Sequence, residues 1–522
     1  MAVDLDARAK AVRERAAAYA AELSAAARDE TTLACERAVL RLIGVTGLDR
    51  SGRPLAVEVV DRLAALGPSR LGGGIGLPFA AAAHEYDLEP AALALDIAAG
   101  HVDLALEAEL LGEPDRRREA EATLAAWLGN AWQRFDANRT ARAELKAVIG
   151  DVSGPSLGID LPLSAAGPAA LAAADAIAAG ADLVRVRVPA DRELRRRLGD
   201  EPEPEDPTDD PELAPAGSQR GLGLLRAAVD EAAAERRSYV GLATQSIGLA
   251  SPDQAVVAAF ERVDLVFADP LETVVEFGIE PGRAIADHVF AARLMARAGV
   301  DLAVGPGPLA MAPEVARGEP LEIADRIGRS LALQAIGVEL SRGAGVADGR
   351  LVLGALAGGD LGAPLAFMPG LVEVGLRRLL YPGLRLLFVE PEDSDADPAW
   401  PLALPTWLAG ADDAVVIIRR PATAGIATAR HEIRQAVAAA AALTRSRLVG
   451  HLTGEAAALA ERSLIVASDT LRDLADDGWE RLLLSPAALA RRSDPSGGWI
   501  GGAGRVARRD GPDIFAATEA AR

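Results

Sequence analysis

The chain has 522 residues, half of them hydrophobic and a quarter charged, and its formal net charge is −21. This length suggests more than one domain, or a barrel of about 250 residues with large additions. The composition is that of a soluble globular protein, without the apolar run of roughly 20 residues that a membrane span needs. The negative charge argues against nucleic acid or an anionic membrane as the main partner, because both are bound by concentrated basic faces.

The first 20 residues alternate charges with alanines and lack an apolar segment, so we expect no signal peptide and a cytoplasmic protein. Cys35 is the only cysteine, which excludes an internal disulfide and a cysteine-built metal cluster. We expect Cys35 to be a small core residue. The only lysines are Lys10 and Lys146. An enzyme that works through a Schiff base needs an amine in its pocket. The lysine for an aldehyde cofactor would therefore come from another chain or from the N-terminal region.

Residues 1–150 are predicted to form an N-terminal helical region. Helices are expected over 7–28, 31–42, 57–66, 91–99 and 116–148. Thr31 and Thr32 can cap the second of these helices, and Gly44 ends it. The glycine-rich segment 72–76 follows no predicted strand and lacks the Lys-Ser/Thr ending of a phosphate loop, so we predict that it packs rather than binds a nucleotide.

A helical stretch runs four times into a short apolar strand that begins at an Asp and ends at a Pro. These strands are 182–189, 264–270, 301–306 and 412–421. Because a strand covered on both faces reads as a continuous apolar run, the pattern predicts an α/β fold with a TIM (β/α)8 barrel over 151–450. The eight strand candidates are 156–163, 182–189, 239–244, 263–267, 302–304, 352–356, 384–389 and 415–418.

Helices are predicted between and after these strands, over 168–179, 222–236, 283–298, 321–341 and 423–444, with another beginning at Ser251. The acidic, proline-rich segment 201–216 is predicted to be a disordered surface insert. Residues 451–522 are expected to form an irregular C-terminal extension. Its Gly- and Arg-rich part, 491–509, can cradle an anionic cofactor tail or can be a flexible terminus, and the sequence favours neither.

Polar residues near the expected strand ends are candidates for an active site, because the active sites of such barrels lie there. They are Asp191, Arg192, Gln245, Ser246, Asp269 and Glu272. Two carboxylates and an amide can surround a small pocket and transfer protons. Alternatively these residues cap the helices that follow, and Asp269 with Pro270 fits a turn equally well. The five histidines show no ligand spacing such as i, i+4, so we predict no metal site and expect His288 to pack or to face water.

Two sets of residues resemble the large (alpha) subunit of lysine 5,6-aminomutase, which is related to ornithine 4,5-aminomutase. The first set is Thr31, Thr32, Glu36, Arg37, Arg41, Leu42, Gly44, Gly47, Asp49, Pro54, Leu55, Val60 and Asp61. The second is Ser153, Gly154, Pro155, Gly180, Ala181, Asp182, Gln219, Arg226, Gly248, Leu249, Pro252, Arg262, Asp264, Asp269, Leu271, Arg283, Gly299, Val300 and Gly305. The resemblance is clear over 30–310 and loose beyond.

The resemblance implies a TIM barrel that pairs with a small subunit, in a hetero-oligomer acting on a small amino acid. In that family the small subunit carries the cobalamin-binding domain and the lysine that holds pyridoxal phosphate. The implied cofactors are therefore adenosylcobalamin and pyridoxal phosphate, and the absence of barrel lysines agrees with this division. We take Ser218 and Gln219 as candidate cofactor-binding residues.

The chain departs from the family at the strand ends. Val188 stands where the family has an Arg, and Glu272 and Phe277 stand where it has a Tyr and an Arg. Segment 163–165 replaces Thr-Gly-Asn, and 303–308 replaces Asn-Thr-Gly-Glu-Asp-Asn with Ala-Val-Gly-Pro-Gly-Pro. The acidic insert replaces a Gly-rich loop near the cofactor, and each partly exposed carboxylate near a phosphate costs about 1 kcal/mol.

Two hypotheses follow from the resemblance and the departures. In the first, the chain is the barrel subunit of an aminomutase with a diverged active-site rim. In the second, it is a non-catalytic or repurposed barrel that binds a cobalamin-carrying small subunit or another small molecule. The fold alone does not decide between them, because function depends on the site.

Overall fold

The structure is a computed structural model of the chain. It describes residues 4–49, 54–65, 68–151, 155–162, 166–187, 215–246, 251–271, 279–305, 322–355, 367–389, 414–418, 453–478, 506–511 and 513–516, with single residues at 274 and between 426 and 435. Most of the predicted helix over 423–444 and most of the acidic insert lie outside this part, although the described single residues between 426 and 435 are helical. Within the predicted insert, Pro215 and Ala216 already belong to a helix.

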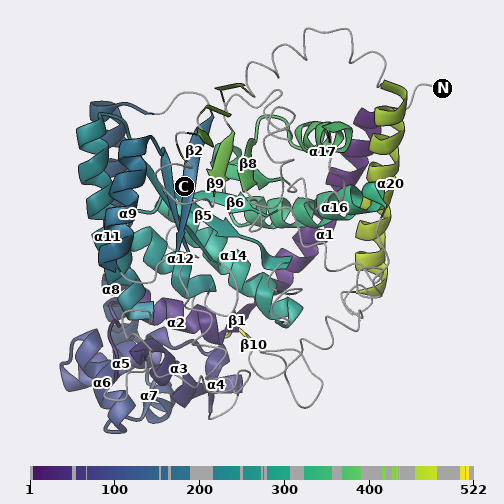
Figure 1. The fold of residues 1–522 in the computed structure, drawn as a ribbon. Helices are drawn as coiled ribbons and strands as arrows, with labels where there is room; N and C mark the ends of the chain where they lie inside the picture. The colour runs from purple at the N-terminus through teal and green to yellow at the C-terminus, as the bar shows by residue number, and fades with distance from the viewer. Residues whose placement is uncertain are drawn as a thin grey trace, which may run out of the picture.

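Eight parallel strands close into a barrel in sequence order, with the last strand paired to the first (Figure 1). The strands are β2 (Ser156–Pro162), β3 (Leu183–Arg187), β4 (Gly241–Gln245), β5 (Leu265–Ala268), β6 (Asp301–Val304), β7 (Leu351–Gly354), β8 (Arg385–Val389) and β9 (Val415–Ile418). The predicted TIM barrel is confirmed, and each predicted strand corresponds to one observed strand.

Each strand presents alternate residues to the barrel lumen and to the surrounding helices. Eight buried side chains form an apolar layer in the lumen: Leu183, Ala243, Leu265, Ala303, Val352, Leu387, Val415 and Ile417. The residues between them, such as Val184, Leu242 and Val266, pack outward with the helices in the main hydrophobic core. The strands are therefore covered on both faces, which explains their continuous apolar sequences.

The Asp that precedes a strand binds the neighbouring strand. The N–H of Asp182 donates to the Leu157 carbonyl at 2.7 Å, and its carboxylate accepts from the Leu157 N–H at 3.0 Å. Asp264 binds Leu242 in the same two ways, at 2.8 Å each. Asp301 differs, because its carboxylate pairs with Arg350 and Arg385. The Asp recurs because it fixes strand register at the N-terminal end of the barrel, which is the end associated with stability.

Helices surround the barrel and connect its strands. They are α9 (Ala166–Ala179), α11 (Pro215–Arg236), α12 (Ser251–Phe260), α14 (Pro281–Ala298), α16 (Ile323–Gly343) and α17 (Phe367–Leu380), with a short 3-10 helix η4 (Asp348–Arg350) before β7. Glycine allows α16 to approach the sheet closely, because a Cβ on Gly337 would lie 2.8 Å from the Val304 side chain.

The first 150 residues are mainly helical, as predicted. The helices are α1 (Leu5–Arg28), α2 (Leu33–Leu42), α3 (Leu55–Ala64), α4 (Pro68–Gly72), α5 (Gly76–Tyr86), α6 (Pro90–Ala99), α7 (Leu104–Leu110) and α8 (Pro114–Ile149). Thr32 caps α2 by accepting from the Cys35 N–H. In Figure 1, α1 starts beside α17 and runs along α16 toward α2, while the other N-terminal helices gather below the barrel.

The C-terminal extension is more regular than expected. Helix α20 (Thr453–Asp477) packs against α1 and α16. Strand β10 (Val506–Arg508) pairs antiparallel with β1 (Glu30–Thr32), so the prediction of an irregular tail over 491–509 is wrong at 506–508. This pairing was not predictable because both strands are only three residues long. The pairing fastens the C-terminal region to the segment between α1 and α2.

Candidate functional site

The lumen becomes polar above the apolar layer, toward the C-terminal ends of the strands. Gly158 faces the lumen, because a Cβ there would lie 2.9 Å from Ile417 and 3.3 Å from Leu183. Asp160 is two residues further along β2 and therefore shares that face. Arg185 follows Leu183 by two residues on β3, and Phe267 follows Leu265 on β5 in the same way. Asp160, Arg185 and Phe267 therefore form one level of charged and aromatic side chains on top of the apolar layer.

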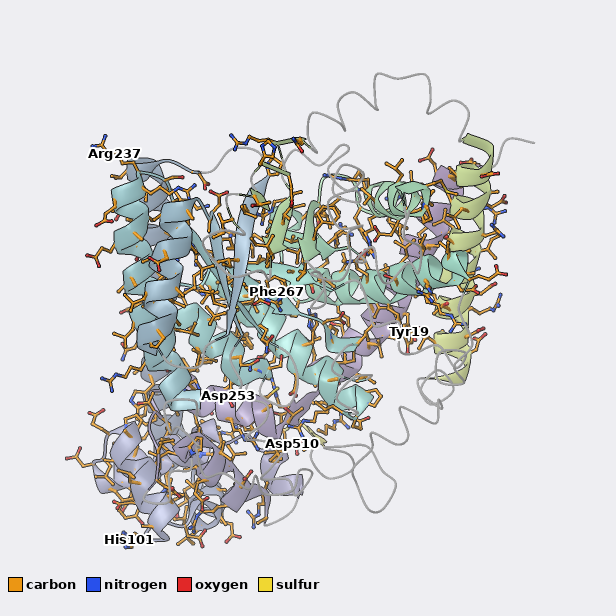
Figure 2. All side chains as sticks on the ribbon, viewed as in Figure 1. Tyr19, His101, Arg237, Asp253, Phe267 and Asp510 are labelled. Carbon is orange, nitrogen blue, oxygen red and sulfur yellow. The ribbon has the colours of Figure 1, made fainter. Side chains whose placement is uncertain are left out.

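Asp160 and Arg185, which we call the charged pair, are register neighbours on adjacent strands. A terminal guanidinium nitrogen of Arg185 lies 3.6 Å from an Asp160 carboxylate oxygen, and the side chains are 9% and 0% exposed. The Arg185 guanidinium also lies over the Phe267 ring, 4.1 Å from its centroid. Figure 2 shows Phe267 in the centre of the barrel region. The ring supplies cation–π attraction and fixes the guanidinium plane.

A small residue on β4 leaves room for the contact between Arg185 and Phe267. Arg185 pairs in register with Ala243 on β4, which is a member of the apolar layer and separates Arg185 from β5. Because Ala243 has only a methyl group, the long Arg185 side chain can pass over it to reach Phe267. Asp160 and Arg185 were not among the predicted site residues, because both lie inside strands and not at their ends. The signal was present as period-two alternation, with Arg185 and Arg187 between valines in β3.

Gln245 and Ser246 lie where β4 ends. Gln245 is the register neighbour of Phe267 on the lumen face and is partly exposed, and its side chain has no hydrogen-bond partner within the described residues. Ser246 is buried, and its hydroxyl donates to the Ser251 carbonyl at 2.7 Å. The Ser251 hydroxyl donates back to the Ser246 carbonyl at 3.1 Å. Gln245 can therefore meet a ligand, whereas Ser246 closes a loop.

Asp269 has the geometry of a residue that caps a helix, which was the alternative to a role in an active site. It is buried just past β5, and its carboxylate accepts from the Leu271 N–H at 2.9 Å. Its side chain also lies against Gly305 past β6, where a Cβ would come within 3.1 Å of the Asp269 Cβ. The structure thus brings the ends of β5 and β6 together at Asp269.

Three of the other predicted site residues, Asp191, Arg192 and Glu272, lie outside the described residues. Ser218 lies in α11, and its side chain is likewise not described. Gln219 donates to the Glu261 carboxylate at 3.0 Å, just past the C-terminal end of α12. This contact ties Gln219 to the chain that leads into β5, so the structure does not bring it together with the residues at the strand ends.

A buried hydrogen-bond network supports the barrel mouth from behind. The Gln334 amide on α16 donates to the carbonyls of Val304, Gly305 and Gly354, at 3.2, 3.0 and 2.7 Å. The Gln334 carbonyl oxygen accepts from Arg377 on α17. Arg377 in turn pairs with Glu373 and donates to Ser330 at 2.9 Å. This network fixes the C-terminal ends of β6 and β7 and was not predicted.

The N-terminal residues that carried the resemblance form buried polar contacts away from the mouth. Arg41 pairs with Asp253 of α12 at 3.3 Å, and both are almost fully buried (Figure 2). Thr32 donates to Asp287 of α14, which has its pKa raised by burial. These contacts join α2 to the barrel helices, so this signature stabilises an interface.

The glycine-rich segment packs as predicted. The Ile75 N–H donates to the Glu36 carboxylate at 2.6 Å, so an internal carboxylate lies where a phosphate loop would need an anion site. Burial raises the pKa of Glu36. A Cβ on Gly72 would lie 2.4 Å from the Arg508 carbonyl oxygen. The glycines therefore allow the chain to approach β10 closely.

The described residues contain no group of three or more His, Cys, Asp or Glu side chains that could hold a metal ion. His288 is buried within hydrogen-bond distance of Ser341, and burial lowers its pKa from 6.5 to about 4. Cys35 is a buried core residue, as expected, and burial raises the pKa of its thiol well above the usual value. Among the described helices, none has both the length and the apolar character to cross a membrane.

A family model described as the D-lysine 5,6-aminomutase TIM-barrel domain of the alpha subunit matches residues 2–382. The chain belongs to this family. The lysine 5,6-aminomutase alpha subunit of Fusobacterium nucleatum is 25% identical over 386 residues, which are 73% of this chain and 70% of that protein. The alpha subunit of Acetoanaerobium sticklandii is 27% identical over 294 residues, 56% of this chain and 54% of that protein. The chain is a divergent member of the aminomutase family.

Solved structures give a weaker likeness. The dihydropteroate synthase of Coxiella burnetii has a TM-score of 0.36 and 12% identity, covering 55% of this chain and 94% of that one. The enzyme of Anaplasma phagocytophilum has a TM-score of 0.34 and 15% identity, covering 54% of this chain and 98% of that one. At this level of similarity nothing about function is transferred to the aminomutase-family chain.

Proposed function

We propose that this chain is the barrel subunit of an aminomutase that moves an amino group between neighbouring carbons of a lysine- or ornithine-type amino acid. The observation that carries the proposal is the family match over 2–382, together with a barrel whose lumen ends in charged and aromatic side chains. A lumen filled only by aliphatic side chains would offer a polar substrate no partner. Asp160, Arg185 and Gln245 supply both charges and an amide.

The described residues do not fit a covalent site for pyridoxal phosphate within this chain. Lys10 pairs with Glu14 on α1 and is exposed. Lys146 pairs with Asp151 at 2.9 Å and lies over the Tyr239 ring, which precedes β4 and therefore lies at the opposite end of the barrel from the mouth. The proposal accordingly assigns the cofactor lysine to a small cobalamin-binding subunit in a hetero-oligomer.

The two proposed cofactors would supply the bond chemistry, with pyridoxal phosphate holding the migrating amine and adenosylcobalamin providing a radical that removes a substrate hydrogen. The work of this chain would be orientation and enclosure. The apolar layer closes the lumen below the charged pair, so water would reach the substrate only from the mouth. The Gln334 network would keep the backbone at the mouth in one geometry.

Reconstitution tests this proposal. The purified chain is mixed with a cognate small subunit, pyridoxal phosphate and adenosylcobalamin, and the cobalamin absorbance is followed after adding D-lysine, L-β-lysine or D-ornithine. We expect the adenosylcobalamin spectrum to change with one of these amino acids. The same mixture without the barrel chain is the control. An unchanged spectrum with all three would refute the proposal.

A second function is favoured by one observation. The described end of β6, formed by Ala303, Val304 and Gly305, carries no polar side chain where the family has Asn and Thr. A barrel altered in this way can serve as a scaffold for the cobalamin-carrying subunit without catalysing the migration. This alternative predicts co-purification with the small subunit and no spectral change with any amino acid.

A further inference from the structure

Residues 506–511 and 513–516, which we call the C-terminal strap, bind the rest of the chain in the way that an extended peptide binds a groove. Strand β10 pairs antiparallel with β1 alone among the described strands (Figure 1). Just beyond β10, the Arg509 N–H donates to the Asp29 carbonyl at 2.6 Å. Adding a strand through main-chain hydrogen bonds is a common mode of peptide recognition. A two-stranded sheet by itself is only marginally stable, so further contacts must hold the strap.

Two glycines allow the strap to lie directly against the backbone of the glycine-rich segment 72–76. A Cβ on Gly511 would overlap the Gly73 carbonyl oxygen, and a Cβ on Gly72 would overlap the Arg508 carbonyl oxygen. The Gly72 carbonyl also accepts from the N–H groups of Asp510 and Gly511, at 2.8 and 3.2 Å. The glycine-rich segment is therefore a seat for the strap.

The end of the strap is anchored on α8 and α14 by one aromatic and one acidic side chain. Phe515 is 2% exposed and packs against Phe290 and Trp132, with centroid distances of 5.3 and 6.0 Å. The Arg293 guanidinium lies over the Phe515 ring, 4.2 Å from its centroid. It also donates to both carboxylate oxygens of Asp513, at 3.2 and 2.7 Å. A buried aromatic side chain beside a two-point Arg–carboxylate pair is a typical anchor of a bound peptide.

The groove is acidic where the strap is basic. Glu30 of β1 stands opposite Arg508 in register. Burial raises the pKa of Glu30, and the like charges of Glu280 and Asp29 raise it further. Arg508 and Arg509 bring two positive charges to this place. Complementary charge of this kind favours a basic segment over other segments as the occupant.

A cavity lies between the strap and the helices beneath it. The strap contributes Arg509, Gly511 and Ile514 to the lining, and the rest comes from the glycine-rich segment and from α2, α5, α8 and α14. The volume is about 20 Å³, which is enough for about one water molecule. Atoms that face a void make fewer dispersion contacts than closely packed atoms. The middle of the strap is therefore held less firmly than its two ends.

We propose that the C-terminal strap is a separable element, which docks like a peptide and can leave its groove while the barrel stays folded. The groove consists of β1, the glycine-rich segment and the Phe515 pocket on α8 and α14. Among the described side chains of the strap, Ala507 and Phe515 are the buried apolar ones. Segments that bury so little apolar surface open locally at a lower free energy than the core. Opening uncovers the Phe515 pocket and the cavity. The inference goes beyond the proposed function and does not depend on it.

Glycine variants of the full-length chain test whether the strap opens separately. Gly511→Ala alters the strap and leaves the groove intact, whereas Gly72→Ala obstructs the groove. Gly73→Ala is the matched control, because a Cβ on Gly73 would have only an ordinary contact of 3.8 Å, with the Arg70 carbonyl oxygen. Hydrogen exchange is followed by mass spectrometry. We expect ~10-fold faster exchange over 506–511 in the first two variants, with the parental rate in the control and unchanged rates in β5 and β6.

A peptide added in trans tests the groove. The probe is a fluorescein-labelled peptide with the sequence of residues 505–517, and its binding is measured by fluorescence anisotropy. We expect it to bind Gly511→Ala ~10-fold more tightly than the parent chain, whose own tethered strap competes at a high effective concentration. Gly72→Ala should bind it no better than the parent does. A Phe515→Ala version of the peptide should lose ~10-fold or more of the affinity for Gly511→Ala.

The exchange pattern of the parent chain keeps the test decisive if a variant fails to fold. The proposal predicts that the strap exchanges faster than the barrel strands in the parent. Equal exchange rates in the strap and the barrel strands would show that they open together, and would overturn the proposal. So would cooperative unfolding of both Gly511→Ala and Gly72→Ala at a much lower temperature than the parent, or a failure of the peptide to bind folded Gly511→Ala.

Discussion

At the scale of single residues, charged side chains have different roles at the two ends of the barrel. At the N-terminal end, Asp264 accepts from the Leu242 N–H, the Tyr239 hydroxyl and Arg226, at 2.8, 2.7 and 3.0 Å. A carboxylate with this many partners is a structural residue. At the C-terminal end, Asp160 and Arg185 pair at 3.6 Å in the lumen. The same residue types thus fix strand register at one end and form a buried ion pair in the lumen at the other.

The role of Asp264 gives a stability prediction. Asp264→Asn keeps the shape of the side chain but removes the charge that faces Arg226 and Arg142. Because Arg142 would lose its carboxylate partner and Arg226 would keep only Asp230, we expect a loss of about 3 kcal/mol in the free energy of unfolding. Urea denaturation measures this loss. The control Asp348→Asn, at an exposed pair with Arg342, should change stability by less than about 0.5 kcal/mol.

His288 gives a prediction about pH. Its pKa in the folded chain is about 4, below the ordinary value of 6.5, because burial disfavours the charged imidazole. At pH values between about 4 and 6.5, the His288 imidazole is protonated in the unfolded chain but neutral in the folded chain. The free energy of unfolding therefore decreases as the pH falls from about 6.5 to 4. The total decrease in the free energy of unfolding is on the order of 3 kcal/mol.

The measurement is chemical denaturation at several pH values. His288→Gln should lose this part of the pH dependence. His101→Gln, which alters an exposed histidine, should retain it. Identical pH profiles for the parent and His288→Gln would contradict the assignment.

At the scale of elements, the sequence predicted the strands, whereas the candidate site residues stay predictions. The eight strands were predictable because parallel strands covered on both faces leave continuous apolar runs, as in 415–418. The ion pair of Asp160 and Arg185 was not predicted, because a single charged residue within an apolar strand does not indicate its partner on the next strand. The pairing of β1 with β10 was not predictable, since three-residue strands leave no periodic signal. The Gln334 network joins side chains from α16 and α17 that are distant in sequence, so no local pattern reports it.

Two helix glycines give a matched prediction at this scale. Gly328 lies where α16 crosses α20, and a Cβ there would be 2.5 Å from the Ser463 carbonyl oxygen. Gly328→Ala should therefore destabilise the chain by about 1 to 3 kcal/mol, because backbone must move. Gly375 in α17 has nothing within 4 Å of its ideal Cβ. Gly375→Ala should stabilise by about 0.5 to 1 kcal/mol through the helix propensity of Ala. Thermal and urea unfolding measure the stability of both variants. Equal changes in stability would contradict the close crossing of α16 and α20 at Gly328.

At the scale of the whole molecule, the N-terminal and C-terminal regions are fastened to each other and to the barrel helices. Helix α1 packs along α16 and α20, and β1 pairs with β10. Near the C-terminus, Phe515 packs on Phe290 of α14 with a centroid distance of 5.3 Å, and Asp513 pairs with Arg293 at 2.7 Å. These contacts lie away from the charged pair. The additions to the barrel therefore hold its surrounding helices together.

The proposal that this chain is the barrel subunit of an aminomutase is tested most directly by the adenosylcobalamin absorbance of the complex reconstituted with a small cobalamin-binding subunit and pyridoxal phosphate. We expect the absorbance to change on adding D-lysine only when both the barrel chain and the small subunit are present. An unchanged absorbance in a complex that has formed would contradict the proposal and favour a scaffold.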